Sequence, residues 1–277
     1  MPVILENIAC RIKNERDPLR NVILNIDSLR INNGEFAGII DTGTGEASAL
    51  GKIICGLAMP DAGSVLNTET DGGAKAAVFF DTEAEKALSE RTVEKEVCVL
   101  LKKTGKSKQE LESAAREAIE LVGLDYEAVR HRSPFELTKA ERRSVSLASL
   151  LAVLPKLIVL DEPMRDMDGV WCARLMELLK KLNGDGVTVI LITADTSRLS
   201  EYASRIIIMK DGSPVLDSSA KNVFSEFFFL NHLGVDVPDV KKCCQMLREN
   251  GMDMPANIIL YEQFLDRLKI LMWRKNK

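Results

Sequence analysis

A glycine-rich segment that follows an apolar run offers the clearest chemistry in this sequence. Residues 39–48 read Ile-Ile-Asp-Thr-Gly-Thr-Gly-Glu-Ala-Ser. Glycines between a strand and a helix let backbone N–H groups surround phosphates, a lysine neutralises the phosphate charge, and a hydroxyl binds magnesium. The segment contains Gly43, Gly45 and Ser48 but no lysine. The frame of a phosphate-binding loop is therefore present without the cation that its chemistry requires.

An acidic pair provides the second chemical signal. Residues 157–163 read Leu-Ile-Val-Leu-Asp-Glu-Pro, so Asp161 and Glu162 directly follow a short, wholly apolar run. Such a run predicts a buried strand, and carboxylates are suitable ligands for magnesium. The pair is also consistent with an acidic turn at a strand end that serves only packing and capping.

Apolar and alternating stretches predict the elements that position these residues. Strands are expected at 3–9, 23–31, 36–40, 76–80, 157–160 and 188–193. A charged segment that contains Pro18, at 14–21, is expected to be a loop. A helix at 48–55 that ends at Gly56 completes the strand, turn and helix order of a phosphate loop. Apolar strands that alternate with helices imply a parallel sheet covered on both faces.

A predominantly helical pattern follows the fourth of these strands. Ser107 and Glu110 have the spacing of a capping box. The apolar residues that follow them at helical spacing are Leu111, Ala114, Ala115, Ala118, Ile119 and Val122. Another helix is expected over 138–154. The pattern therefore predicts a helical insertion at about residues 92–150, within a first domain of residues 1–218.

The rest of the chain predicts one more helix, a hairpin and a small appended unit. Residues 170–183 have an amphipathic helical pattern, and 205–217 are expected to form a hairpin around Asp211-Gly212. Residues 219–277 are expected to form a C-terminal extension of short helices. Its phenylalanines at 224, 227, 228 and 229 are either local core or a contact surface.

The composition is that of an ordinary globular protein. The 277 residues are 46% hydrophobic and 28% charged, which is enough for a sizeable core. A formal net charge of −4, with no basic stripe and interleaved aromatics, argues against a nucleic-acid partner. The six cysteines have no metal-ligand spacing, so we expect reduced thiols. Neither a signal peptide nor an apolar run of ~18 residues is visible, which predicts a cytoplasmic protein.

These landmarks, in this order, resemble the ATPase subunits of ABC transporters. The closer resemblance is to the energy-coupling-factor (ECF) group, which includes cobalt-transport ATPases and drives vitamin and metal-ion uptake. The matching segments are 34–36, 56–57, Pro60, Gly63, 92–94, 121–124, 157–163, 188–193, 223–225, 233–234 and 237–238. The resemblance covers nearly the whole chain. It implies an α/β fold of the P-loop NTPase type, with a mainly parallel sheet, an N-terminal antiparallel β part, the helical insertion and the C-terminal extension.

The resemblance also implies roles for the retained polar residues. Asp161 would hold magnesium together with Ser48, and Glu162 would act as general base in a functional enzyme. Asp168 would lie in a subunit-contact loop after the acidic strand. Thr138 would be the second residue of the signature segment, which faces the nucleotide held by an opposite subunit.

Two alignments of the phosphate loop remain open. An ungapped alignment, anchored on Gly56, Pro60 and Gly63, places Asp41, Thr44 and Glu46 on the family glycines, Ala47 on the lysine and Ser48 on the hydroxyl. A gapped alignment keeps Gly43 and Gly45 but places Glu46 on the lysine. We prefer the ungapped alignment because it leaves the helix intact. Neither supplies a lysine, and Lys52 lies at least one turn further along.

Other positions also depart from the family pattern. Phe80 replaces a glutamine that senses magnesium and water, and Ala194 replaces a histidine that contacts the γ-phosphate. Cys10 and Ile12 fall where an aromatic residue would stack on adenine. The signature Leu-Ser-Gly-Gly-Gln is replaced by Leu-Thr-Lys-Ala-Glu at 137–141. Thr138 and Glu141 have capping-box spacing, so this segment is equally explained as a helix start.

These substitutions predict that ATP and magnesium bind weakly or not at all. A carboxylate ~4 Å from a phosphate charge is repelled by roughly 4 kcal/mol at an effective dielectric constant of ~20. Together with the missing lysine, this weakens binding by about a thousandfold or more.

We therefore expect a degenerate, poorly hydrolytic or non-hydrolytic subunit that acts as a structural partner in an ATPase dimer. Its partners would be another ABC ATPase subunit, in a homodimer or a heterodimer, and an integral membrane transporter subunit at the cytoplasmic face of the membrane. Two alternatives remain open. One is a functional ATPase that energises transport, and the other is a soluble interaction protein that uses the fold without a transporter.

Overall fold

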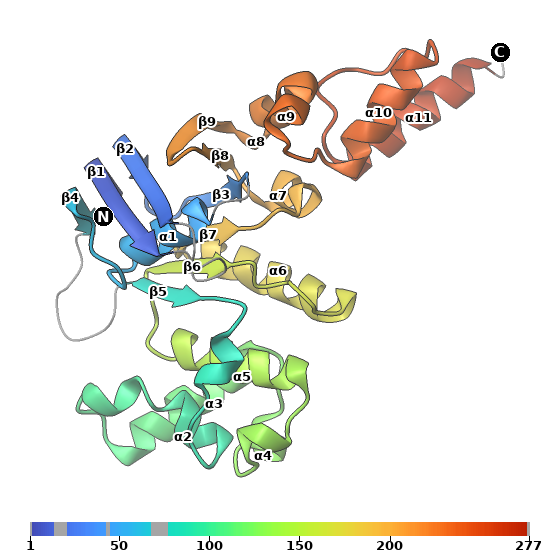
Figure 1. The fold of residues 1–277 in the computed structure, drawn as a ribbon. Coiled ribbons are helices and arrows are strands. Elements are labelled where there is room, and N and C mark those ends of the chain that lie inside the picture. The colour runs from blue at the N-terminus through green and yellow to red at the C-terminus, as the bar shows by residue number, and fades with distance from the viewer. Residues whose placement is uncertain (1, 14–20, 43–44, 68–76, 276–277) are drawn as a thin grey trace.

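The computed structural model describes residues 2–13, 21–42, 45–67 and 77–275. Loop residues 14–20 and the glycine-rich residues Gly43 and Thr44 lie outside this part of the chain. The described structure contains two sheets, a helical insertion and a helical C-terminal part (Figure 1). Within the described ranges, none of the helices combines the length and the apolar character that crossing a bilayer requires.

A six-stranded sheet forms the centre of the protein. Its strands, in spatial order, are β5 (Ala77–Phe80), β6 (Leu157–Asp161), β7 (Thr188–Ile192), β3 (Phe36–Asp41), β8 (Arg205–Lys210) and β9 (Ser213–Ser219). Neighbouring strands from β5 to β8 are parallel, and β9 is antiparallel to β8. Almost all residues of β3, β6 and β7 are buried, as expected for a sheet covered on both faces. The predicted mainly parallel sheet is confirmed.

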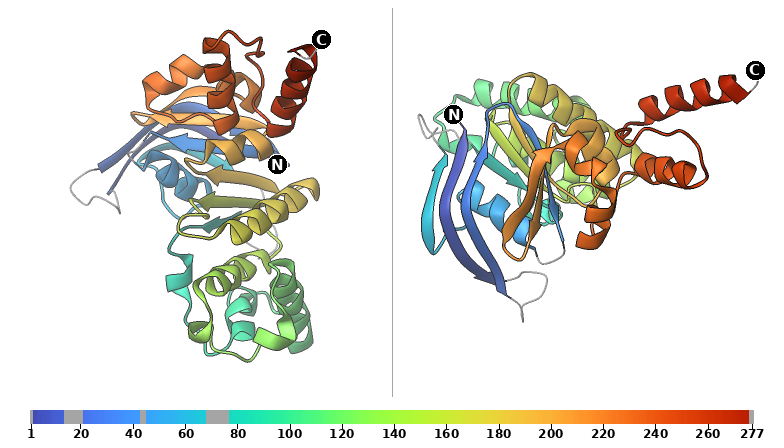
Figure 2. Two further views of the ribbon diagram at one scale, coloured as in Figure 1. Left: turned by 90° about the vertical axis from the view of Figure 1, so that its right-hand side faces the viewer. Right: turned by 90° about the horizontal axis from the view of Figure 1, so that it is seen from above.

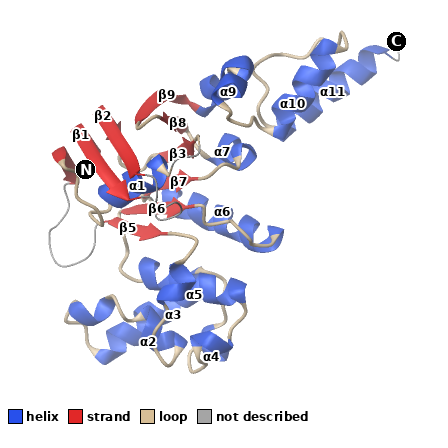
Figure 3. Ribbon diagram, in the orientation of Figure 1, coloured by secondary structure: helices blue, strands red, loops and turns tan. Residues whose placement is uncertain are grey.

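The N-terminal antiparallel β part is a three-stranded sheet. Its spatial order is β2 (Asn21–Ile31), β1 (Val3–Lys13) and β4 (Ala62–Asn67). Helix α1 (Glu46–Ile54) packs between this sheet and the six-stranded sheet, and apolar side chains of all three form one core (Figures 1 and 3). The sequence pattern did not predict β4, because Gly63 and Ser64 interrupt its apolar residues.

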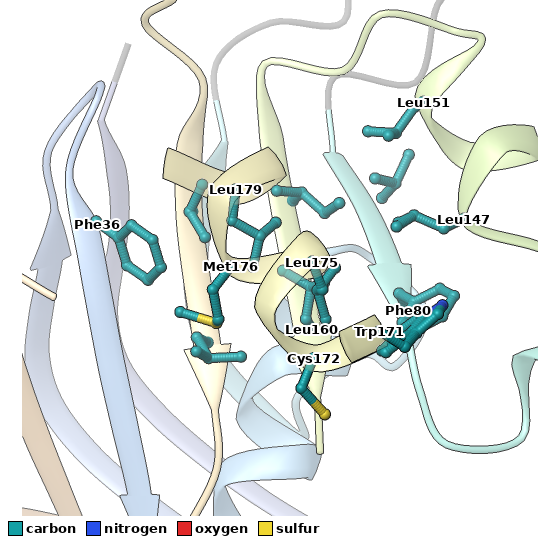
Figure 4. Packing of buried hydrophobic residues seen from close by; sticks show 14 of the residues in the cluster. Phe36, Phe80, Leu147, Leu151, Leu160, Trp171, Cys172, Leu175, Met176 and Leu179 are labelled. Carbon is teal, nitrogen blue, oxygen red and sulfur yellow. The ribbon is translucent and has the colours of Figure 1, made fainter. Parts of the chain in front are cut away.

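The opposite face of the six-stranded sheet is covered by helices. The two that contribute most of the packing are α5 (Lys139–Leu151) and α6 (Gly169–Gly184). Phe80 and Leu160 from the strands pack with Leu147 of α5 and Trp171 of α6 (Figure 4). The strand ends that carry the candidate site residues are therefore held between two separate apolar cores.

The helical insertion lies between β5 and β6 in the sequence. Its helices are α2 (Val93–Val97), α3 (Lys108–Leu121), α4 (Tyr126–Val129) and α5. Both predicted capping boxes form, with Ser107 and Glu110 at the start of α3 and Thr138 and Glu141 at the start of α5. The insertion and the C-terminal helices lie at opposite ends of the molecule (Figures 1 and 2).

The C-terminal part begins in contact with the six-stranded sheet, and its last two helices extend away from both sheets (Figure 2). The helices of this C-terminal part are α8 (Ala220–Ser225), α9 (Phe227–Leu233), α10 (Asp239–Glu249) and α11 (Tyr261–Lys275). Helix α7 (Thr196–Tyr202), which precedes β8, was not predicted from the sequence. The prediction of short helices is wrong for α11, which has 15 residues and contains neither glycine nor proline. Phe224 is fully buried whereas Phe228 is 75% exposed, so the phenylalanines are divided between core and surface.

Candidate functional site

The first part of the candidate site is the turn from β3 into α1. Gly45 precedes the helix with φ 85°, a left-handed conformation that glycine adopts without steric cost. Gly45 has no side chain that could cap the helix, but Asp41 Oδ2 accepts a hydrogen bond from the Ala47 N–H at 3.2 Å. The start of a helix attracts anions through its free N–H groups. In this protein the carboxylate of Asp41 binds one of them.

Glu46, the first residue of α1, places a second carboxylate at the same turn. Its side chain is only 3% exposed, and its Oε2 atom has no hydrogen-bond partner among the described residues. Ala47 is fully buried in the core that α1 shares with both sheets. Lys52, the only cation within α1, lies in the last turn. The start of α1 therefore carries two carboxylates, and neither residue that aligns with a phosphate-binding lysine is a cation.

The acidic pair lies where β6 ends and a tight turn begins. Asp161 is buried, and Glu162 adopts a left-handed φ of 47°, which is unusual for a residue other than glycine. The Glu162 N–H donates to the carbonyl of Ile192 at 2.8 Å, which fixes the turn to the end of β7. Both carboxylate oxygens of Glu162 also accept hydrogen bonds, from the Ala194 N–H at 3.0 Å and the Thr193 hydroxyl at 3.3 Å. The predicted general base is thus bound to the segment that follows β7.

The sheet brings these two parts to the same edge. In the parallel register, Ile39 of β3 and Asp161 of β6 both pair with Ile192 of β7. Asp41 and Asp161 are therefore the last residues of two strands that have only β7 between them. Ser48 lies in the first turn of α1 and is half-buried. The described His, Cys, Asp and Glu side chains form no group of three or more that could hold a metal ion.

Phe80 and Ala194 provide no polar side chain at this edge. Phe80 is fully buried and belongs to the core on the α6 side of the sheet, whereas α1 belongs to the core on the other side. Ala194 is exposed, and its backbone N–H is bound to Glu162. A core aromatic ring and a methyl group therefore lie at the two positions where the family resemblance implies a glutamine and a histidine.

Thr138 and Asp168 act as helix caps. Thr138 Oγ1 accepts a hydrogen bond from the Glu141 N–H at 3.3 Å, and Asp168 Oδ1 accepts one from the Trp171 N–H at 2.8 Å. Lys139 Nζ lies 3.9 Å from Asp166 Oδ2, which brings the starts of α5 and α6 next to each other. The capping explanation for Thr138 is confirmed, and contact with a nucleotide of another subunit remains a prediction.

The position expected for adenine stacking has no aromatic side chain. Cys10 is buried, its thiol lies 3.7 Å from the carbonyl oxygen of Met59, and burial raises the pKa of this thiol. The side chain of Ile12 lies outside the described residues.

One polar residue near the site was not identified from the sequence. Arg143 on α5 is 2% exposed, and its guanidinium reaches both the acidic turn and the segment after β5. In the sequence Arg143 is indistinguishable from Arg142, because helical spacing does not show which of two adjacent arginines is enclosed by other elements.

Sequence comparison places the chain among transport proteins. Residues 24–165 match the family model described as ABC transporter. The chain is 32% identical over 281 residues to the energy-coupling factor transporter ATP-binding protein EcfA2 of Streptococcus pneumoniae, covering 97% of this chain and 99% of the relative. It is 34% identical over 276 residues to the protein of the same name from Bacillus cereus, covering 95% and 93%.

Solved structures give a consistent result. The dimeric bacterial ABC transporter cassette MJ0796 superposes with a TM-score of 0.66 at 25% identity, over 79% of this chain and 98% of that chain. The cbiO1 protein of Clostridium perfringens, described as part of the ABC transporter complex cbiONQ, superposes with a TM-score of 0.66 at 21% identity. That superposition covers 86% of this chain and 96% of cbiO1.

Proposed function

The chain belongs to the ABC transporter family, and on this basis we propose that it is an ATP-binding-type subunit of an ECF transporter with a degenerate phosphate site. The observation that carries the proposal is the hydrogen bond from the Ala47 N–H to Asp41 at the start of α1. A phosphate bound there would have to displace the carboxylate of Asp41. It would also meet Glu46, a second carboxylate, and no lysine.

The expected penalty is large on the scale of binding energies. Repulsion between a carboxylate and a phosphate charge ~4 Å apart is roughly 4 kcal/mol at an effective dielectric constant of ~20. That energy corresponds to about a thousandfold in the dissociation constant. The missing lysine and the missing adenine-stacking ring act in the same direction. The proposed protein therefore binds ATP poorly and serves chiefly as a structural partner in an ATPase dimer.

Calorimetry with Mg-ATP tests this proposal directly. We expect the wild-type chain to bind Mg-ATP on the order of a thousandfold more weakly than the EcfA2 protein of Streptococcus pneumoniae under the same conditions. The measurement on the EcfA2 protein is the control for the buffer, the magnesium and the quality of the nucleotide. A dissociation constant in the low micromolar range for this chain would overturn the degenerate site and favour a functional ATPase.

A functional ATPase is the second candidate, because the acidic pair Asp161 and Glu162 is retained at the sheet edge. In this alternative Glu162 would have to leave the Ala194 N–H and the Thr193 hydroxyl before it could activate water. Steady-state hydrolysis that disappears in Glu162→Gln would support this candidate. Activity that is absent, or unchanged by Glu162→Gln, would count against it.

We further propose that residues 1–218 form the cassette and that residues 219–277 form an added C-terminal unit. The protein would bind another ABC ATPase subunit and an integral membrane subunit, and would lie at the cytoplasmic face of the membrane through that contact. Exposed apolar side chains on the C-terminal helices, such as Phe228, Met272 and Trp273, are candidates for partner contact. Co-purification with a membrane protein separates this proposal from a soluble interaction protein without a transporter.

Dimerisation with a different ATPase subunit is expected to be favoured over self-association. By family resemblance, each nucleotide site combines the phosphate loop of one subunit with the signature segment of the other. In a homodimer both sites would combine the altered loop with the altered segment at 137–141. Co-expression with an intact ATPase subunit, followed by light scattering, should therefore give a heterodimer in preference to a homodimer.

A matched measurement on the chain alone provides the control for this prediction. A strict monomer at high concentration, both alone and with the candidate ATPase subunit, would contradict it. A stable homodimer that persists when the second subunit is in excess would contradict the preference for a heterodimer.

A further inference from the structure

Arg143 is a buried cation at the junction of three segments. It lies on α5, is 2% exposed, and is the largest of the fully buried side chains. Its guanidinium donates hydrogen bonds to two parts of the chain that are distant in sequence. One is the segment after β5, and the other is the turn after β6.

The contacts with the turn after β6 involve backbone carbonyls. Arg143 Nη1 donates to the carbonyl of Arg165 at 2.8 Å and to that of Pro163 at 3.3 Å. The flanking residues Glu162 and Asp166 both have left-handed φ angles, 47° and 59°. Such conformations persist in residues other than glycine only where surrounding contacts hold them. The guanidinium binds two carbonyls of this turn and supplies contacts of that kind.

The contacts with the segment after β5 include the ion pair of Arg143. Arg143 Nη2 donates to the carbonyl of Thr82 at 2.6 Å, and Nε donates to Glu85 Oε2 at 2.8 Å. Glu85 belongs to a short 3-10 helix at Ala84–Ala87 and is itself only 15% exposed. Nearby, the Ser146 hydroxyl of α5 donates to the carbonyl of Ala84 at 3.1 Å. The middle of α5 is thereby bound to the chain that leaves β5.

We propose that Arg143 is a positioning residue that sets the orientation of the helical insertion and the conformation of the acidic turn together. The N–H groups of its guanidinium are held in one rigid plane. They therefore bind the acceptors on both segments at one position of α5. A buried guanidinium that loses a partner leaves an uncompensated charge, which is strongly unfavourable. Movement of α5 away from either segment therefore disturbs the other. This coupling requires no bound nucleotide and is independent of the proposed function.

Hydrogen exchange of the full-length chain tests the coupling. Arg143→Met keeps an unbranched side chain about as long as the aliphatic stem of arginine and removes every N–H donor. We expect exchange to accelerate by about tenfold or more in both contacted segments, residues 82–87 and 163–167, because hydrogen bonds to a charged group are lost at each. Amides of β7, such as that of Val189 bonded to the carbonyl of Glu35, should keep their wild-type protection.

Arg130→Met is the matched control. Arg130 is also an arginine of the insertion and binds Glu112 at 2.9 Å and Glu127 at 3.3 Å, all within the insertion. Its replacement should accelerate exchange in α3 and α4 and leave residues 163–167 unchanged. If Arg143→Met does not fold, Arg143→Lys replaces it, because lysine keeps the charge without the planar guanidinium.

The outcomes separate coupling from general destabilisation. Faster exchange in both contacted segments with protected β7 amides supports the proposal. Uniform acceleration along the whole chain, faster exchange in only one of the two segments, or no change in either would overturn it. The same criteria apply to Arg143→Lys, for which the acceleration should be smaller than for Arg143→Met where both variants fold.

Discussion

A chain that carries Asp41→Gly, Glu46→Gly and Ala47→Lys is expected to bind Mg-ATP about a thousandfold more tightly than the wild-type protein. Asp41→Gly releases the N–H that its carboxylate now binds at 3.2 Å. Glu46→Gly removes a buried carboxylate and lets the backbone approach a phosphate closely. The introduced lysine adds a positive charge at a helix start that already favours an anion, provided that its chain extends out of the core that now encloses Ala47. Ser48 would then be placed to bind magnesium.

Calorimetry of the triple variant and of the double variant Glu46→Gly with Ala47→Lys isolates the role of Asp41. The double variant should bind less tightly than the triple variant, because Asp41 still competes for the helix N–H. Equal affinities would show that Asp41 is displaced without cost. If neither variant binds ATP, the ungapped alignment of the loop is wrong or the pocket is closed.

Hydrolysis should not return together with binding in the triple variant. Phe80 and Ala194 still present no polar side chain to water or to the γ-phosphate, and Glu162 is still bound to the segment after β7. The variant should therefore turn over ATP no faster than the wild-type protein in a phosphate-release assay. Rapid hydrolysis would show that the substitutions outside the phosphate loop are harmless.

Phe80→Gln is expected to lower the free energy of unfolding by about 3–5 kcal/mol. Phe80 is fully buried and packs in the same core as Trp171 and Leu147 (Figure 4). Glutamine at this position would leave a cavity in the core that contains the indole ring and would bury an amide without an evident partner. Urea denaturation followed by tryptophan fluorescence measures the loss, because the ring of Trp171 lies in the affected core.

Phe135→Gln provides the matched control for Phe80→Gln. Phe135 is 63% exposed, so the same exchange of side chains should change stability by less than about 0.5 kcal/mol. A wild-type stability for Phe80→Gln would show that position 80 tolerates a polar side chain. Packing of the core would then not explain why this chain has phenylalanine at position 80, where the family pattern has glutamine.

Sequence periodicity was sufficient for most of the architecture. The apolar runs at 157–160 and 188–193 became the buried parallel strands β6 and β7. The capping boxes at 107–110 and 138–141 formed because a cap joins residues only three positions apart. The missing lysine is also a property of the sequence alone. Such features depend on near neighbours in the chain, so they can be predicted without the tertiary structure.

Some local features were missed although the sequence contained a signal. The length of α11 could have been predicted, since residues 261–275 contain no glycine or proline. The strand β4 is weaker in pattern, because its six residues include Gly63 and Ser64. It becomes a strand by pairing with β1, which is a contact between segments far apart in the chain.

The chemistry of the site was decided by contacts that only the tertiary structure creates. The hydrogen bond between Asp41 and Ala47, the buried oxygen of Glu46 and the enclosed guanidinium of Arg143 depend on which elements approach those residues. Phe80 likewise became a core residue because of the face of β5 on which it lies. Residue identity and spacing determine which groups are available for chemistry. Burial and the partners brought by packing determine whether those groups can act. The reason is that removing a charge from water costs much free energy unless the charge is paired.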